Sequence, residues 1–174
     1  MTPPGWTLRR LAGLDDAEIA ALADVLIDCV EGDASVGFMH PLSRDRAVAF
    51  WRRVATDVEA GERVLLVAED GHGICGTVQL VLAPMENQPH RADLSKLLVH
   101  RRARRRGLGA ELMRAAEAES LACGRTLLVL DTATDDAERL YERLGWSRVG
   151  VVPGYALMPR GARCDTAIYY RELS

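Results

Sequence analysis

The sequence predicts a mixed α/β domain over residues 1–174, on three observations. Apolar stretches of strand length alternate along the chain with stretches in which apolar residues recur at helical spacing. Gly61, Gly124 and Gly145 mark the ends of three predicted helices, and Gly32 directly follows the other one. A length of 174 residues, of which 48% are hydrophobic and 27% charged, suits one domain with one hydrophobic core.

The N-terminal half is predicted from two helix starts and one tight turn. Asp15 followed by Glu18 forms a capping box, after which apolar residues recur at helical spacing. Ser43 can cap a second helix, which ends at Gly61. Residues 70–73, Asp-Gly-His-Gly, are typical of a hairpin turn. The predicted elements are a strand at Trp6–Leu11, helices at 16–31 and 43–61, and strands at Arg63–Ala68 and Ile74–Leu82.

The C-terminal half is predicted to hold the other two helices. After an arginine-rich turn, Leu108, Leu112 and Ala116 share one face of a helix. Thr134 or Asp135 caps the last helix. The predicted elements are a strand at Leu94–Val99, a helix at 107–123, a strand at Thr126–Leu130, a helix from Thr134 or Asp135 to Leu144, and closing strands at Trp146–Val152 and Thr166–Glu172.

The turn before the third helix carries the strongest functional signal. Gly107 and Gly109 follow five arginines that stand in six positions, namely Arg101, Arg102, Arg104, Arg105 and Arg106. A helix that begins at a glycine turn presents unpaired backbone N–H groups and the positive end of its dipole. Because neighbouring guanidinium groups add positive charge, the turn is predicted to bind a phosphate or pyrophosphate.

The spacing of the turn limits which phosphorylated cofactor it can bind. No Gly-Lys pair occurs in the chain, which excludes a P-loop, and only Gly107 and Gly109 of a dinucleotide fingerprint are in place. The pattern Arg-x-x-Gly-x-Gly at 104–109, between a strand and an amphipathic helix, resembles motif A of the GNAT family of acetyl-coenzyme A-dependent N-acetyltransferases. The predicted order of elements is also similar to that family along nearly the whole chain.

This resemblance implies a fold and a cofactor. The fold is a single mixed, mostly antiparallel sheet flanked by four helices, and the acetyl donor is acetyl-CoA. Two positions depart from the family pattern: Arg101 stands where proline is common, and Thr134 where asparagine is common. Both departures are expected to weaken individual cofactor contacts. The implied cofactor-binding residues are Leu97, Leu98, Val99, Arg104, Arg105, Arg106, Gly107, Leu108, Gly109, Ala110, Thr134 and Tyr141.

A second segment, residues 137–146, resembles the part of the GNAT family that bears a catalytic tyrosine. The resemblance implies that Tyr141 lies near the coenzyme A sulfur and serves as general acid. Acetyl transfer releases a thiolate, whose parent thiol has a pKa of about 8.5. A phenol with a pKa of about 10 can supply a proton or a hydrogen bond to it. The alternative is a tyrosine that only packs in the core.

The reaction also needs an oxyanion site and a base. The resemblance implies that the backbone of Leu97 and Leu98 polarises the thioester carbonyl. An alkylammonium with a pKa of about 10.4 is only about 0.1% neutral at a pH of about 7, so its proton must leave through a carboxylate, a histidine or a water chain. Asp131, at the end of a predicted central strand, is the favoured base. The other candidates, which stay open, are Asp93, Glu86, His40 and His90.

The acceptor site is predicted to be built from loops. Phe38, Met39 and His40 lie between the first two helices, and Tyr155 lies in a predicted mobile loop. Together with Asp93, these side chains are candidates to hold a polar amine. The phrases around Phe38 and Tyr155 are also similar to the tabtoxin resistance acetyltransferases, a GNAT branch that acetylates a small toxin. The resemblance implies direct attack, in a ternary complex, by the primary amine of a small, amino-acid-like molecule.

Composition limits the partners. A net charge of −3 argues against general nucleic-acid binding. The four cysteines form no Cys-x-x-Cys pair, so we expect no metal site, no disulfide framework and a cytoplasmic location. No apolar run approaches the length of about 18 residues that a membrane span needs. The family resemblance alone implies a possible homodimer. Alternatives are a non-catalytic sensor of acetyl-CoA and a small ligand, an acetyltransferase acting on a protein amine, and a nucleic-acid-binding module.

Overall fold

The structure, a computed structural model, describes residues 5–174 and contains one seven-stranded sheet and four α-helices in that range. The sheet order is β1-β2-β3-β4-β5-β7-β6, and β4–β5 is its only parallel pair. The predicted fold class is therefore confirmed. The strands are β1 (Thr7–Leu11), β2 (Arg63–Asp70), β3 (Gly73–Leu82), β4 (Arg91–Val99), β5 (Leu127–Thr132), β6 (Ser147–Leu157) and β7 (Arg163–Glu172). The helices are α1 (Asp16–Glu31), α2 (Arg44–Glu59), α3 (Leu108–Ala122) and α4 (Asp135–Arg143), with a short 3₁₀ turn, η1 (Arg101–Ala103).

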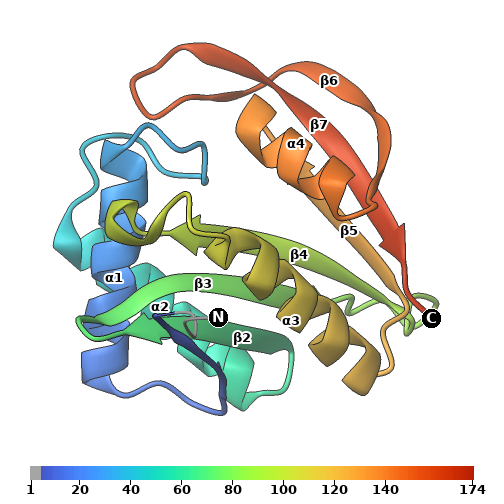
Figure 1. The fold of residues 1–174 in the computed structure, drawn as a ribbon, viewed down its shortest axis with the longest axis horizontal. Coiled ribbons are helices and arrows are strands. Elements are labelled where there is room, and N and C mark those ends of the chain that lie inside the picture. Colours follow the sequence, from blue (N-terminus) through green and yellow to red (C-terminus); the bar gives the residue numbers. More distant parts are fainter. Residues whose placement is uncertain (1–4) are drawn as a thin grey trace.

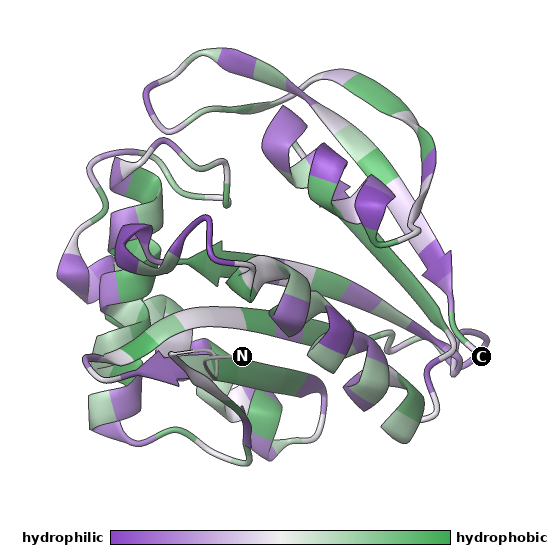
Figure 2. Cartoon of the chain, in the orientation of Figure 1, coloured by the Kyte–Doolittle hydropathy of each residue, from purple (hydrophilic) through white to green (hydrophobic). Residues whose placement is uncertain are grey.

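Helices cover both faces of the sheet (Figure 1). Successive side chains of β2 point to opposite faces, as the pleat requires. Leu66 belongs to the hydrophobic cluster that includes Leu112 of α3, whereas Leu65 belongs to the cluster that includes Leu22 of α1 and Trp51 of α2. Figure 2 shows the result as hydrophobic colouring along the central strands and hydrophilic colouring along much of α4.

Two of the three predicted helix caps make a side-chain hydrogen bond. The Asp15 carboxylate accepts a hydrogen bond from the Glu18 N–H at 2.7 Å, and Glu18 accepts one from the Asp15 N–H at 3.0 Å, so the capping box is confirmed. The Ser43 hydroxyl accepts a hydrogen bond from the Arg46 N–H at 3.3 Å. Thr134 is the N-cap of α4, but its side chain makes no capping hydrogen bond. The predicted N-cap position is therefore confirmed for Thr134, without a side-chain hydrogen bond.

Strands β4 and β5 pair only at their beginnings. The pairing joins Arg91–Asp93 to Leu127–Val129, although β4 continues to Val99 and β5 to Thr132. Figure 1 shows the two strands diverging from the side of the C-terminus, which leaves a V-shaped gap in the sheet. The register of β4 on β3 also shifts in this part of the strand, so that Lys96 and Leu97 together stand opposite a single residue. This β-bulge places Lys96 at a φ of 52°.

The predicted mobile loop around Tyr155 is wrong. Residues 153–156 lie within β6, which pairs antiparallel with β7. The register is irregular between Val152 and Ala156, because Pro153 and Gly154 interrupt regular pairing. The Gly154 N–H instead donates a hydrogen bond to the Asp165 Oδ1 of β7, at 2.8 Å. A Pro-Gly pair typical of a loop is thus accommodated in a long hairpin. No helix among the described residues is long and apolar enough to span a membrane.

Candidate active site at the gap between β4 and β5

A cavity of about 720 Å³, here called the turn cavity, opens where β4 ends. The arginine-rich turn and the N-terminal ends of α3 and α4 complete its walls. All the predicted cofactor-binding residues line it except Arg106 and Tyr141. Those that do are Leu97, Leu98, Val99, Arg104, Arg105, Gly107, Leu108, Gly109, Ala110 and Thr134.

Two glycines shape the backbone of this cavity. Gly107, the N-cap of α3, has a φ of 89°, in the left-handed region that favours glycine. A Cβ on Gly109 would lie 3.4 Å from the Leu140 side chain, so glycine lets α3 approach α4 closely. Within residues 5–174 no side chain caps α3, which leaves the first N–H groups of the helix, from Leu108 to Ala110, available to a ligand. The N-terminus of α3 therefore favours an anion in the turn cavity.

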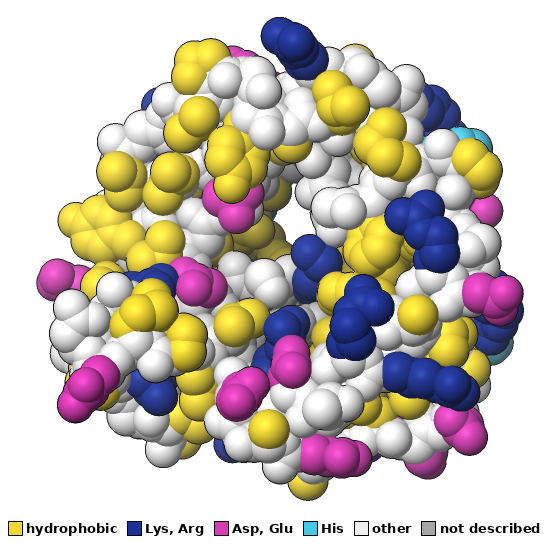
Figure 3. Space-filling view, turned by 180° about the vertical axis from the view of Figure 1, so that it is seen from behind, with side chains coloured by type: hydrophobic (Ala, Val, Ile, Leu, Met, Phe, Trp, Pro, Cys, Tyr) yellow, Lys and Arg dark blue, Asp and Glu magenta, His cyan; other side chains and the backbone are white. Residues whose placement is uncertain are grey.

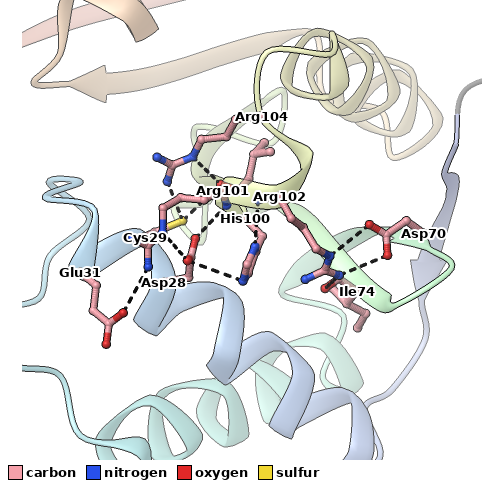
Figure 4. A network of polar contacts seen from close by, with 10 residues as sticks. Asp28, Cys29, Glu31, Asp70, Ile74, His100, Arg101, Arg102 and Arg104 are labelled. Carbon is pink, nitrogen blue, oxygen red and sulfur yellow. Dashed lines mark hydrogen bonds and ion pairs between the residues drawn. The ribbon is translucent and has the colours of Figure 1, made fainter.

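Two of the five arginines are neutralised by carboxylates (Figure 4). The Arg101 Nε donates to Asp28 at 2.6 Å, and the Arg102 guanidinium donates to Asp70 at 3.1 and 3.2 Å. Arg102 also donates to the carbonyl oxygens of Gly73 and Ile74. These two arginines hold the turn against α1 and the β2–β3 hairpin, so the positive charge offered to a ligand is smaller than the run of five suggests.

Asp28 of α1 is the main anchor of the turn. Its side chain is 8% exposed, and besides the Arg101 side chain it accepts the Arg101 backbone N–H at 2.9 Å. The His100 Nε2 lies 3.6 Å from its Oδ1. Burial raises the pKa of Asp28, but the hydrogen bonds from Arg101 and the positive charge around the carboxyl outweigh this, so the pKa lies below its ordinary value. Asp28 is therefore ionised at neutral pH.

Arg104 lines the turn cavity, and its guanidinium contacts both the end of β4 and α1. Its Nε donates to the Val99 carbonyl oxygen at 2.8 Å, and its Nη2 lies 3.7 Å from the Cys29 sulfur. Figure 4 shows the side chain reaching from the turn toward α1. Arg104 thus ties the last residue of β4 to the turn and also places positive charge in the cavity.

Arg105 and Arg106 are both exposed, yet only Arg105 lines the turn cavity. Arg105 has a φ of 60° and, within residues 5–174, no hydrogen-bond or ion-pair partner. The Arg106 guanidinium instead stacks on Trp6, 5.1 Å from the ring centroid. The structure therefore places the Arg106 side chain outside the cavity, contrary to the prediction. Sequence alone does not separate two neighbouring arginines that point to opposite sides.

A second cavity, of about 340 Å³ and here called the gap cavity, lies between the diverging strands. It adjoins the turn cavity, with which it shares five lining residues: Ala34, Val36, Leu97, Thr134 and Ala137. Figure 3 shows the molecule hollowed at its centre, with Lys or Arg atoms at the edge of the opening and many hydrophobic atoms around it. The other residues of the gap cavity come from the 34–37 loop, β4, β5, α4, β6 and β7.

Tyr141 of α4 lines the gap cavity and is only 6% exposed. Its ring packs beside Trp146 and Tyr169, with centroid distances of 6.1 and 5.9 Å. Among residues 5–174, nothing accepts a hydrogen bond from its hydroxyl. Burial raises the pKa of Tyr141 to about 12, and the charge of Asp131 adds to the effect. The phenol is therefore protonated at neutral pH and has a hydrogen to donate.

Asp131 also lines the gap cavity, from the C-terminal part of β5. Its Oδ2 accepts a hydrogen bond from the Thr166 hydroxyl at 3.1 Å, which fixes the carboxylate from β7. Asp93 instead pairs with Arg91 at 2.5 Å and lines neither cavity. The remaining candidate bases, Glu86, His40 and His90, line neither cavity as well. Of the five candidates, geometry favours Asp131.

The predicted acceptor residues are mostly not brought together. Phe38 packs edge-on against Phe50 of α2 at 5.3 Å, Met39 is 40% exposed, and His40 is exposed. Tyr155 alone among the predicted acceptor residues lines the gap cavity. The loop contributes residues 34–37 instead, because Gly37 at a φ of 87° turns the chain before the aromatic side chain.

Sequence reasoning missed several cavity residues. Lys96 lines the gap cavity. A single positively charged residue in the mostly apolar stretch 94–99 was the feature of the sequence that could have indicated it. Arg139 and Arg143 line the turn cavity, and their i,i+4 spacing on α4 was the visible signal. Thr166 carried no local signal, because its position beside Asp131 depends on the pairing of β5 with β7.

Comparison with known proteins identifies this arrangement. Residues 61–148, half of the chain, match the family described as acetyltransferase (GNAT) domain. The chain belongs to the GNAT family. Members of this family are acetyltransferases, which fits two adjoining cavities at a gap between strands.

Solved structures share this GNAT fold over nearly the whole chain. A phosphinothricin acetyltransferase from Sinorhizobium meliloti, in complex with acetyl-CoA, has a TM-score of 0.81 at 19% identity, covering 98% of this chain and 89% of that one. A ribosomal-protein-alanine N-acetyltransferase from Brucella melitensis has a TM-score of 0.79 at 19% identity, covering 96% of this chain and 99% of that one. An N-acetyltransferase from Staphylococcus aureus Mu50 has a TM-score of 0.80 at 17% identity, covering 97% of this chain and 99% of that one. The first two are named for different acceptors, so the shared fold does not select the acceptor.

Proposed function

We propose that this GNAT protein transfers an acetyl group from acetyl-CoA to the primary amine of a small, amino-acid-like molecule. The observation that carries the proposal is the junction of the turn cavity with the gap cavity at Leu97, Thr134 and Ala137. The turn cavity suits an anionic cofactor, and the gap cavity holds a buried phenol and a carboxylate. A thioester at the junction would lie between the cofactor groups and the acceptor groups.

The cofactor fits the turn cavity by charge and by backbone geometry. The N–H groups at the start of α3 are suited to the pyrophosphate of coenzyme A, and Arg104 and Arg105 add positive charge. The part of β4 beyond Asp93 has no β5 partner. Its backbone groups can therefore pair with an extended, amide-bearing chain such as pantetheine, which would run along Leu97–Val99.

The proposed reaction is direct attack of the amine on the thioester in a ternary complex. The C–N bond forms, the C–S bond breaks and the coenzyme A thiolate leaves, while the backbone of Leu97 and Leu98 polarises the carbonyl. The nitrogen of the tetrahedral intermediate loses its second proton, which converts the thiolate to the coenzyme A thiol. The Tyr141 hydroxyl stabilises the departing sulfur. Since its pKa of about 12 exceeds the value of about 8.5 for a thiol, its main contribution is a hydrogen bond to the thiolate.

Asp131 is the proposed base. The acceptor amine arrives as an ammonium with a pKa of about 10.4 and must lose a proton before it attacks. Asp131 lines the same cavity as Tyr141 and is held by Thr166, so an ammonium between them would meet a fixed carboxylate. The proton then passes from the amine to Asp131, directly or through one water.

The size of the gap cavity supports a small acceptor. A volume of about 340 Å³ lies at the lower end of the range of about 300–1,000 Å³ in which ligand pockets fall. The sequence resemblance of the segments around Phe38 and Tyr155 to tabtoxin resistance acetyltransferases supports the same proposal. A protein amine remains the second candidate, since one structural neighbour is named for a ribosomal protein.

The test is release of coenzyme A thiol with a panel of amines, for the wild type and for Tyr141→Phe. We expect Tyr141→Phe to lower kcat about 100-fold and to change the Kd for acetyl-CoA less than about 2-fold. Tyr170→Phe is the matched control, because Tyr170 is exposed on β7 and lines neither cavity. Acetyl-CoA binding without turnover of any amine would favour a sensor. Equal kcat values for wild type and Tyr141→Phe would remove Tyr141 from the mechanism.

Three further expectations accompany this function. We propose a single domain, because both hydrophobic clusters pack against the same sheet. We propose a homodimer through the edge strand β6, on which Val149 is 65% exposed and Leu157 49% exposed. Light scattering at two concentrations would test the dimer. A cytoplasmic location and the absence of nucleic-acid and membrane partners stay predictions.

A further inference from the structure

Lys96 is the only lysine of the chain, which otherwise uses arginine for its positive charges. It lies in the middle of β4, where a φ of 52° is unusual for a residue with a side chain. The β-bulge at this point re-aims the side chain, as bulges commonly do beside active sites. Lys96 consequently lines the gap cavity together with Asp131 and Tyr141.

The ammonium group of Lys96 has no charged partner. Among residues 5–174, no carboxylate lies within ion-pair distance of it, and it makes no hydrogen bond. Its Nζ lies 5.8 Å from the centroid of the Phe50 ring, a weak contact for a cation. Burial lowers the pKa of Lys96, Asp131 opposes this effect and Arg63 adds to it. An ammonium partly removed from water without a counter-ion is costly, and an anionic ligand would remove that cost.

The position of Lys96 relative to Asp131 is complementary to a zwitterion. Both residues line the gap cavity, and their charged groups are too far apart to form an ion pair. A ligand that lies between them can place an anion on Lys96 and an ammonium on Asp131. The loop residue Gly37 lies beside this ammonium, since a Cβ at that position would be 3.7 Å from the Lys96 Nζ, an ordinary van der Waals distance.

We propose that Lys96 binds an anionic group of the acceptor, a carboxylate or a phosphinate, so that the enzyme selects zwitterionic amines. This inference rests on the proposed acetyl transfer and adds the chemical class of the acceptor. Lys96 holds the anion, Asp131 faces the ammonium, and the amine is thereby presented to the thioester at Leu97. A neutral or purely cationic amine leaves Lys96 unpaired and binds weakly.

The test compares acids with their amides. Each common L-amino acid, and L-phosphinothricin, is assayed beside its α-carboxamide with the wild type, Lys96→Met and Lys96→Arg. The wild type is expected to prefer at least one acid over its amide by at least about 10-fold in kcat/KM. Lys96→Met should lose this preference through a higher KM for the acid, and Lys96→Arg should restore part of it.

Two readouts keep the outcome independent of folding and of the cofactor. The Tm of Lys96→Met should equal or exceed that of the wild type, because the change removes an unpaired, partly buried charge. Calorimetry should give the same Kd for acetyl-CoA in both proteins. If acetyl-CoA does not bind the wild type, the proposed function fails and this inference fails with it.

Three results would overturn the inference alone while acetyl-CoA still binds. One is an unchanged preference for the acid in Lys96→Met. Another is acetylation by the wild type of the amides only. The third is transfer of the acetyl group to Lys96 itself, which mass spectrometry would locate at the only lysine of the chain. That result would make Lys96 an acceptor and not a binding residue.

Discussion

The turn cavity and the gap cavity adjoin, yet the chain builds them differently. The lining groups of the turn cavity come from three stretches of the chain, and almost all of its predicted cofactor-binding groups come from one of these, residues 97–110. Those of the gap cavity come from six separate segments, between the loop after α1 and strand β7. A site made from one continuous segment can be recognised in a sequence, whereas a site assembled by strand pairing cannot. The two cavities should therefore respond differently to substitution.

The largest expected difference follows from Gly107→Val. A β-branched residue is disfavoured at a φ of 89°, so the start of α3 would shift and its N–H groups would lose their alignment. Since a hydrogen bond to a charged group contributes about 1.5–3 kcal/mol, loss of one or two should raise the Kd for acetyl-CoA about 100-fold. Calorimetric titration would measure it.

Gly61→Val is the matched control for that change. Gly61 has a φ of 74° with open space around it, but it lies after α2 and away from both cavities. The backbone strain is similar, so the loss of folding stability should be similar while the Kd for acetyl-CoA stays within about 2-fold. Equal Kd values for the two variants would mean that the α3 N-terminus does not bind the cofactor.

A smaller effect is expected from Asp28→Asn. The Asp28 side chain links α1 to the arginine-rich turn but does not line the turn cavity. The amide cannot hold the Arg101 guanidinium by charge, so we expect the Kd for acetyl-CoA to rise about 5-fold and the Tm to fall. Asp24→Asn is the control, since its ion pair with Arg44 is exposed. A Tm and a Kd that match those of the wild type would remove Asp28 as the anchor.

The same variant gives a pH dependence with a defined sign. The pKa of folded Asp28 lies below the ordinary value of 3.8, so its ionised form stabilises the fold. This contribution is complete above about the unfolded pKa and is lost as the pH falls through the folded value. The difference in unfolding free energy between wild type and Asp28→Asn should therefore be constant near neutral pH and shrink in acid. A difference that grows in acid would contradict the assigned charge state.

The smallest effect on folding stability is expected from the two helix N-caps, of which only Ser43 makes a capping hydrogen bond. Ser43→Ala removes a bond to the Arg46 N–H and should cost about 1 kcal/mol of folding free energy. Thr134→Ala removes no such bond and should cost less than about 0.5 kcal/mol. Denaturant titration of both variants would measure this. A larger loss for Thr134→Ala would show that the α4 cap depends on the hydroxyl.

The sequence predicted the fold and the turn cavity because their signals are local. The Asp15–Glu18 capping box, the glycines at 107 and 109 and the helical periodicity each act within a few residues of the chain. Of the predicted acceptor residues only Tyr155 lines the gap cavity, because the positions of these side chains depend on tertiary packing. Phe38 packs on Phe50, and Lys96 is re-aimed by a β-bulge that no residue type announces.

The most direct test of the central claim is a comparison of acetyl-CoA affinity between Arg105→Ala and Arg106→Ala. Both arginines are exposed and adjacent, but only Arg105 lines the turn cavity, while Arg106 stacks on Trp6. Calorimetry should give a Kd about 10-fold higher for Arg105→Ala, since one charge-assisted contact is lost, and a nearly unchanged Kd for Arg106→Ala. A larger loss for Arg106→Ala, or no loss in either variant, would contradict binding of the cofactor in the turn cavity.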